Sequence, residues 1–164
     1  MAQQLLIEGG TIRPLREQKE LLYEATVVVE DGVIVEIAPR KRSRGSRHRQ
    51  VIDARGRLVM PGLVNAHTHL YQVLLRGMWD TLPLTPWLKN IYGVAPVLQR
   101  DDCYWGARLG ALEALAGGVT TVCDHFFLNP TINHTIATIE GMRETGIRAV
   151  LARTIMDRGS LPPT

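Results

Sequence analysis

The feature that most constrains this 164-residue chain is an alternation of strand-like and helical segments in its second half. Runs rich in β-branched residues recur there, and longer segments of helical character separate them. The strand-like runs are residues 63–69, 119–124 and 147–153. A strand–helix–strand order predicts parallel strands joined by helical crossovers, so we expect an α/β fold. Three parallel strands would leave sheet edges unpaired, and the pattern is therefore that of the front of something larger.

Local signals predict where the helices begin and end. Thr85 and Pro86 suit the N-cap and the first turn of a helix that continues through Trp87. A longer helix is expected from the acidic pair at 101–102 to the glycine pair at 117–118, through Leu109, Leu112 and Leu115. A third helix is predicted from the Asn-Pro signal at 129–130 to about Glu144.

The first 60 residues predict short antiparallel strands. Segments 25–30 and 33–37 flank Asp31-Gly32, a strong signal for a two-residue hairpin because glycine tolerates the positive φ of a type I′ turn. Two further strand-like segments, 51–54 and 57–60, follow around Gly56. These strands are too few to enclose a core, so we interpret them as part of a small β-sandwich.

Composition excludes several classes of protein. The 45% apolar content excludes a disordered chain, and no apolar run approaches the roughly 18 residues of a membrane helix. No signal peptide is apparent at the start, and two cysteines fit a reducing cytoplasm, where we expect the protein to be. The run Arg40–Gln50 carries six Lys/Arg and no acid, but it contains no aromatic residue for base stacking. We interpret it as a solvated loop and expect no nucleic-acid partner.

His67 and His69 form the first candidate site. On a strand, this spacing places both imidazoles on one face, with Thr68 on the other. Two neutral imidazoles side by side can share one cation at metal–nitrogen distances of about 2.0–2.1 Å. Two ordinary histidines at a strand end are the alternative, because so short a motif recurs by chance.

The surrounding sequence supports the metal-site interpretation. The pair ends the run 53–69, which includes Pro61-Gly62, and further matches follow at 70–77, 82–88 and 112–121 and at Asp124-His125. Together these motifs closely resemble the amidohydrolase superfamily. The branch they look like holds the 8-oxoguanine, guanine and S-adenosylhomocysteine deaminases and the triazine hydrolases. The resemblance covers essentially the whole chain, and its motifs are specific for the superfamily but only suggestive for the substrate.

The resemblance implies a fold and two domains. Residues 61–164 would be the first three β/α units of a metal-dependent (β/α)8 TIM barrel. Residues 1–60 would be part of a small β-sandwich of the composite urease-like type. Because five of the eight barrel units would be missing, the chain is expected to be truncated.

The same resemblance assigns residues to a site. His67 and His69 match the first two metal ligands, for Zn²⁺ or alternatively Fe²⁺. Gln72 matches a position that can hydrogen-bond the amide edge of a purine, Trp87 an aromatic that can stack on a heterocycle, and Arg153 an arginine that contacts substrate. The ordinary alternatives are a polar surface residue for Gln72 and a core anchor for Trp87.

Two other histidines carry weaker expectations. His125 follows the second barrel strand and is not a standard metal ligand in the family. We therefore favour a role in which it holds a metal ligand in place or contacts the substrate, rather than a role as a third ligand. His134 lacks a partner pattern and is expected to be solvated.

The implied activity is hydrolytic deamination or dechlorination of a nitrogen heterocycle, such as a purine, pyrimidine or triazine, by metal-activated hydroxide. No catalytic residue is assigned, because the family's remaining ligands and its proton shuttle lie on later strands. This chain alone is therefore expected to be inactive. The alternative is a non-catalytic remnant, or one half of a split protein that needs a complementary chain. A small heterocycle is the expected partner, no membrane is expected, and the full-length form is expected to be a homo-oligomer.

Overall fold

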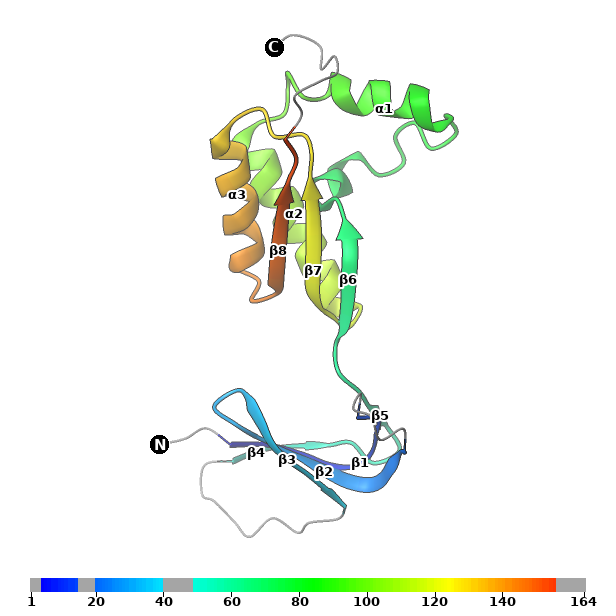
Figure 1. The fold of residues 1–164 in the computed structure, drawn as a ribbon, viewed down its shortest axis with the longest axis vertical. Helices are drawn as coiled ribbons and strands as arrows, with labels where there is room; N and C mark the ends of the chain where they lie inside the picture. Colours follow the sequence, from blue (N-terminus) through cyan, green and yellow to red (C-terminus); the bar gives the residue numbers. More distant parts are fainter. Residues whose placement is uncertain (1–3, 15–19, 40–48, 156–164) are drawn as a thin grey trace. The chain divides into compact units, whose positions relative to one another are not determined.

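The computed structural model describes residues 4–14, 20–39 and 49–155 (Figure 1). The chain divides into two compact units, Met1–Pro61 and Gly62–Thr164, which are described separately below. Most of the basic run lies outside the described residues, so its interpretation as a solvated loop stays a prediction. In the described part of the chain, no helix is long and apolar enough to span a bilayer.

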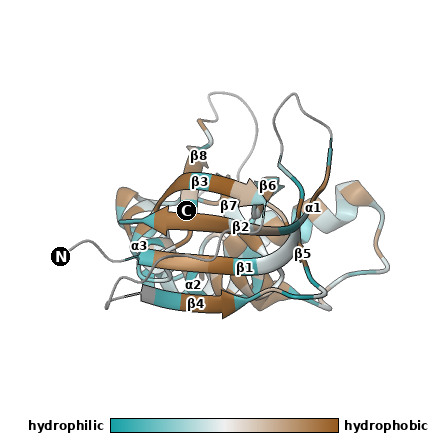
Figure 2. Cartoon of the chain, turned by 90° about the horizontal axis from the view of Figure 1, so that it is seen from below, coloured by the Kyte–Doolittle hydropathy of each residue, from teal (hydrophilic) through white to brown (hydrophobic). Residues whose placement is uncertain are grey.

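The first unit contains one five-stranded sheet with the order β3-β2-β1-β4, and β5 also pairs with β1. The strands are β1 (Gln4–Ile12), β2 (Leu22–Glu30), β3 (Val33–Pro39), β4 (Arg49–Asp53) and β5 (Leu58–Val59). Its small core is formed by Ile12, Ala25 and Val27. Figure 2 shows apolar residues along β1 to β4, and several on β3 are exposed. The described part of this unit is a single sheet, so a complete sandwich stays a prediction.

The hairpin prediction is confirmed, whereas the antiparallel prediction fails for the last two strands. Glu30 pairs with Val33 across Asp31 and Gly32, whose φ angles of 47° and 81° are both positive. Strands β4 and β5, in contrast, run parallel to β1. The turn at 54–57 does not fold β5 back onto β4. Instead, both strands pair with the same edge of β1, β4 with its first half and β5 with its last residues.

The second unit contains a parallel sheet with the order β6-β7-β8, as the alternation predicts. The strands are β6 (Leu63–Thr68), β7 (Val119–Phe126) and β8 (Arg148–Arg153). The helices are the 3₁₀ helix η1 (Leu70–Leu75), α1 (Leu84–Gly93), α2 (Arg100–Ala116) and α3 (Ile132–Arg143). Figure 1 shows all three strands pointing the same way, so their carboxyl ends share one edge of the sheet.

The predicted ends of the long helix are confirmed to within a residue. The backbone N–H of Gln99 donates to the Asp102 carboxylate at 2.8 Å, and this capping box starts α2. Gly117 ends the helix. Helix α1 begins one residue before Thr85, with Pro83 at its N-cap position, so Thr85 is not the cap.

Small residues, rather than leucines, form the buried face of α2. Leu109 and Leu112 are exposed, whereas Cys103, Gly106, Ala107, Gly110 and Ala111 are buried. A Cβ on Gly106 would come within 2.9 Å of the Tyr71 backbone, and one on Gly110 within 2.9 Å of the Leu70 side chain. The glycines therefore let η1, which follows the histidine pair, approach α2 closely.

The expectation that His134 is solvated is wrong. Its side chain is half-buried at the start of α3, and its Nε2 lies 3.0 Å from the Leu98 carbonyl oxygen. Its Nδ1 lies 2.9 Å from the Thr131 hydroxyl oxygen. Both ring nitrogens are thus engaged in holding the segment before α2 against α3, a role that the local sequence does not reveal.

The contact between α2 and α3 generates a stability prediction. A Cβ on Gly141 of α3 would collide with the Tyr104 carbonyl oxygen of α2, so we expect Gly141→Ala to lower the free energy of unfolding by about 1–3 kcal/mol. Gly93→Ala is the matched control, because a Cβ there meets nothing within 4 Å and alanine favours helix. Urea unfolding of both variants measures this. Equal stability of the two variants would contradict the packing argument.

Candidate metal centre

Polar side chains gather at the carboxyl ends of the three parallel strands. His67 lies at the end of β6 and His69 directly follows that strand, His125 lies near the end of β7, and Thr154 follows β8. Ligand and active sites of parallel α/β sheets form at this edge. The convergence comes from the parallel pairing, which places the ends of β6, β7 and β8 next to one another.

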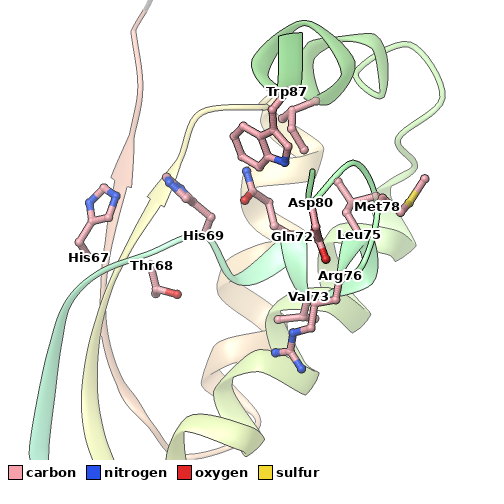
Figure 3. Close-up of a pocket in the computed structure, with 11 residues that line it drawn as sticks. His67, Thr68, His69, Gln72, Val73, Leu75, Arg76, Met78, Asp80 and Trp87 are labelled. Atoms are coloured by element: carbon pink, nitrogen blue, oxygen red, sulfur yellow. The ribbon is translucent and has the colours of Figure 1, made fainter. Parts of the chain in front are cut away.

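The histidine pair projects from an irregular end of β6. Their ring centroids lie 4.9 Å apart at an interplanar angle of 82°. Figure 3 shows Thr68 directed away from the two rings, as the strand period predicts. Between the paired positions Asn65↔Val122 and Thr68↔Asp124, β6 advances three residues and β7 two, so the strand carries a bulge at this point. The backbone N–H of His67 donates to the Asn65 side-chain oxygen at 3.2 Å within the bulge.

The orientation of His69 is set by strand β7. Its Nδ1 lies 2.6 Å from the His125 carbonyl oxygen, which can only accept, so Nδ1 carries the hydrogen and Nε2 keeps its lone pair. Burial is the main cause that lowers the pKa of His69 below its usual range. The ring is therefore neutral at physiological pH and offers Nε2 to a cation.

His125 joins the pair to form a cluster of three imidazoles. Its ring centroid lies 5.6 Å from that of His67 and 5.2 Å from that of His69, and one potential ligand atom from each ring lies within 4.8 Å of the others. The His125 Nε2 lies 2.6 Å from the Thr154 hydroxyl oxygen. Imidazole nitrogens suit zinc and ferrous iron, so the donor set fits a transition metal.

A pocket of about 420 Å³ opens beside the pair. Figure 3 shows Gln72 and Trp87 on its wall, with the Gln72 amide beside the indole ring. The Gln72 Nε2 donates to the Tyr71 hydroxyl at 3.2 Å, which orients the amide. Trp87 is half-buried and also packs against the core, so its two sequence interpretations are compatible. The wall also contains Asp80, which sequence reasoning did not select.

Arg153 is not brought to this pocket. It is on the face of β8 that packs towards α3, and its Nε donates to the Thr135 hydroxyl at 3.2 Å. Leu151, two residues earlier on the same face, packs against the core beneath the helices. The structure therefore groups His67, His69, Gln72 and Trp87 and leaves Arg153 apart from them.

A buried carboxyl group lies behind the histidines. Asp124 is fully buried, and its Oδ1 accepts the backbone N–H of Leu70 at 2.8 Å. Its Oδ2 has no hydrogen-bond partner among the described residues. Burial raises the pKa of Asp124 to about 6, and the bond from Leu70 opposes that shift. The sequence placed this residue at the end of the strand-like run 119–124 and in a family motif, without a role of its own.

The sequence could not show that His125 lies beside the histidine pair. The motif spacing that marks His67 and His69 is local, whereas His125 lies 56 residues beyond His69 and meets it only through strand pairing. The available signal was its position near the end of the strand that follows the pair's own strand.

These features are those of an α/β protein with a candidate metal centre at the carboxyl edge of a parallel sheet. The amidohydrolase family model matches residues 58–162, and the chain belongs to that family. It is 40% identical over 158 residues to a 5-methylthioadenosine/S-adenosylhomocysteine deaminase of Symbiobacterium thermophilum, and the aligned region covers 96% of this chain and 35% of that protein. The corresponding Pyrococcus furiosus deaminase is 39% identical, over 93% of this chain and 34% of the relative.

Solved structures agree with this membership. A zinc complex of atrazine chlorohydrolase from Arthrobacter aurescens matches with a TM-score of 0.83 at 30% identity, over 94% of this chain and 36% of that one. An adenosine deaminase from Xanthomonas campestris with bound zinc matches with a TM-score of 0.78 at 35% identity, over 89% of this chain and 33% of that one. The chain spans about a third of the length of the curated relatives it matches.

The buried Asp124 generates a pH prediction. Its pKa of about 6 in the folded chain exceeds the 3.8 of a free aspartate side chain, so between about pH 4 and 6 the folded chain holds a proton that the unfolded chain releases. The free energy of unfolding should therefore fall as pH rises through this window, by on the order of 3 kcal/mol, and Asp124→Asn should remove that slope. Urea unfolding at a series of pH values with a chelator present measures the difference between the two chains. Parallel pH profiles would contradict the prediction.

Proposed function

We propose that this chain is the N-terminal part of a metal-dependent hydrolase that removes an amino group or a halide from a nitrogen heterocycle. The observation that carries the proposal is the imidazole pair of His67 and His69 on the wall of a pocket that also holds Gln72 and Trp87. A cation site, an amide and an aromatic ring on one wall are what a hydrolase of flat, hydrogen-bonding rings requires.

His67 and His69 would hold the metal, with Zn²⁺ favoured and Fe²⁺ as the alternative. The orientation of His69 supports this, because its hydrogen-bonded Nδ1 leaves Nε2 available. Zinc in the similar adenosine deaminase and atrazine chlorohydrolase structures supports the choice of metal. A bound ion of this kind supplies Lewis acidity and activates water near neutral pH.

Gln72 and Trp87 would place the ring. A side-chain amide offers both a donor and an acceptor, which matches the edge of a purine or a hydroxylated triazine. The Tyr71 hydroxyl takes one of the amide hydrogens and leaves the other hydrogen and the carbonyl oxygen for a ligand. The indole of Trp87 would stack on the ring face. Arg153 stays a prediction from the sequence, since its guanidinium would have to leave Thr135 to reach a substrate.

The sheet β6-β7-β8 would be the first three units of a (β/α)8 barrel, preceded by part of a β-sandwich. The parallel order of the strands and the histidines at their carboxyl ends support this arrangement. In the family, further strands carry the remaining ligands and the proton shuttle, so this chain alone would not turn over substrate. The complete enzyme would be a cytoplasmic homo-oligomer.

Among heterocycles, we favour a 6-aminopurine nucleoside such as 5-methylthioadenosine or S-adenosylhomocysteine, because the relatives named above are deaminases of those compounds. The protein made from its natural reading frame is assayed for ammonia release from these two nucleosides, adenosine, guanine and 8-oxoguanine, and for chloride release from atrazine. Bound metal is quantified in the same samples. Ammonia from one or more purines supports the proposal. No product from any compound after loading with zinc or ferrous iron would overturn it.

The metal site has its own prediction. The 164-residue chain should bind Zn²⁺ weakly, and His67→Ala and His69→Ala should each weaken binding by at least about tenfold, because two imidazoles share the ion. His134→Ala is the control, since His134 is bonded within the fold at Leu98 and Thr131. Competition with a chromophoric chelator gives the dissociation constants. Equal losses in all three variants would refute the assignment of ligands.

The pocket wall gives a second test at the level of binding. Trp87→Ala should weaken the binding of S-adenosylhomocysteine more than Trp87→Phe does, because phenylalanine keeps an aromatic face. Trp105→Ala is the matched control, since that indole is exposed on α2 and outside the pocket. Equilibrium dialysis measures the three affinities with the protein made from its natural reading frame. Identical affinities for the Ala and Phe variants would contradict the stacking role.

A further inference from the structure

Asp124 is a carboxyl group in an apolar setting that the proposed function does not use. It lies on the same face of β7 as Val122 and Phe126, which are fully buried under the helices. Cys103 of α2 and Thr138 of α3 are also fully buried in this region. A carboxyl group in such a place costs free energy unless a hydrogen bond compensates, and only its Oδ1 has a partner among the described residues.

That one partner is the first backbone N–H of helix η1. The Leu70 nitrogen lies 2.8 Å from the Asp124 Oδ1. The first N–H groups of a helix have no partner inside it, and the N-cap residue of η1, His69, makes no capping hydrogen bond with its own side chain. Asp124 therefore caps η1 from a neighbouring strand, at the peptide bond that follows His69.

Two consecutive residues of β7 thus hold two consecutive residues after β6. Asp124 accepts the Leu70 N–H, and the His125 carbonyl oxygen accepts the hydrogen on the His69 Nδ1. Strand β7 therefore holds His69 at two points. One hydrogen bond holds its imidazole ring, and the other holds the Leu70 nitrogen, which is bonded directly to the carbonyl carbon of His69. Loss of the hydrogen bond between the Leu70 N–H and Asp124 would let the peptide between His69 and Leu70 rotate, and the imidazole ring would move away from the His125 carbonyl oxygen.

We propose that Asp124 is a positioning residue for the candidate metal centre: the hydrogen bond that it accepts from the Leu70 N–H keeps the His69 ring on the His125 carbonyl oxygen and so leaves Nε2 available to hold a cation. The inference rests on the proposed function, because it takes His69 as a metal ligand. It adds a residue that touches neither the ion nor the substrate and acts through the backbone. Groups behind a ligand commonly change metal affinity about 10–100-fold.

Three variants separate positioning from general core packing. Asp124→Leu removes the acceptor and fills the space, whereas Asp124→Asn keeps an oxygen that can accept the Leu70 N–H. Thr138→Val is the control, because Thr138 is also fully buried and its hydroxyl donates to the His134 carbonyl oxygen within α3, away from the backbone that follows His69. Each chain is first shown to be folded by a cooperative urea transition.

The first measurement needs no metal. In the metal-free chain, ¹⁵N chemical shifts of the His69 ring report which nitrogen carries the hydrogen, and exchange of the Leu70 amide hydrogen reports its bond. We expect Asp124→Leu to lose the Nδ1–H preference and the Leu70 protection, and Asp124→Asn and Thr138→Val to retain both. Unchanged ring shifts in a folded Asp124→Leu chain would overturn the inference.

The second measurement is Zn²⁺ affinity of the same chains. Asp124→Leu should bind Zn²⁺ at least about tenfold more weakly than the unaltered chain does. Asp124→Asn and Thr138→Val should have nearly the same Zn²⁺ affinity as the unaltered chain. An equal loss in Thr138→Val would overturn the inference in favour of a packing effect. If the unaltered chain binds no zinc while its ring shifts respond to Asp124→Leu as expected, the proposed metal site fails and the structural link from Asp124 to His69 holds.

Discussion

The pairing of β6 with β7 is the interaction on which the rest of the second unit depends. It joins two segments more than 50 residues apart, and the register places Thr68 opposite Asp124. Because the paired positions before this point are Asn65 and Val122, one extra residue of β6 is accommodated in a bulge just before the second histidine. That register puts the His125 carbonyl oxygen within hydrogen-bond reach of the His69 ring. Neither strand alone contains this arrangement.

Burial gives the site its electrostatic character. It raises the pKa of the Asp124 carboxyl group and lowers that of His69. Because of the lowered pKa, the His69 imidazole is uncharged at neutral pH and keeps a lone pair to donate. The small residues of α2 contribute to this burial. Gly106 and Gly110 let η1 settle on α2, and Leu70 and Tyr71 are nearly inaccessible as a result. The same packing fixes the Tyr71 hydroxyl that orients Gln72.

Local chemistry explains which sequence predictions succeeded. The turn at Asp31-Gly32, the helix start at the acidic pair Asp101-Asp102 and the helix stop at Gly117 depend only on neighbouring residues, and the structure contains all three. Predictions that required knowledge of a distant partner did less well. Strand β4 runs parallel to β1 rather than antiparallel, and His134 bonds to Leu98 instead of water. Propensity carries no information about which segment will lie alongside.

Neighbouring residues were enough to predict the α/β class of the second half, the parallel sheet and two imidazoles on one side of a strand, because the strand and helix periods are local patterns. Tertiary structure alone decided that His125 completes a cluster with His67 and His69, that Arg153 turns to Thr135, and that a buried Asp124 caps the helix after the pair. Each of these depends on strand register or on helix packing across dozens of residues. Residues so far apart in sequence become neighbours only when the chain folds.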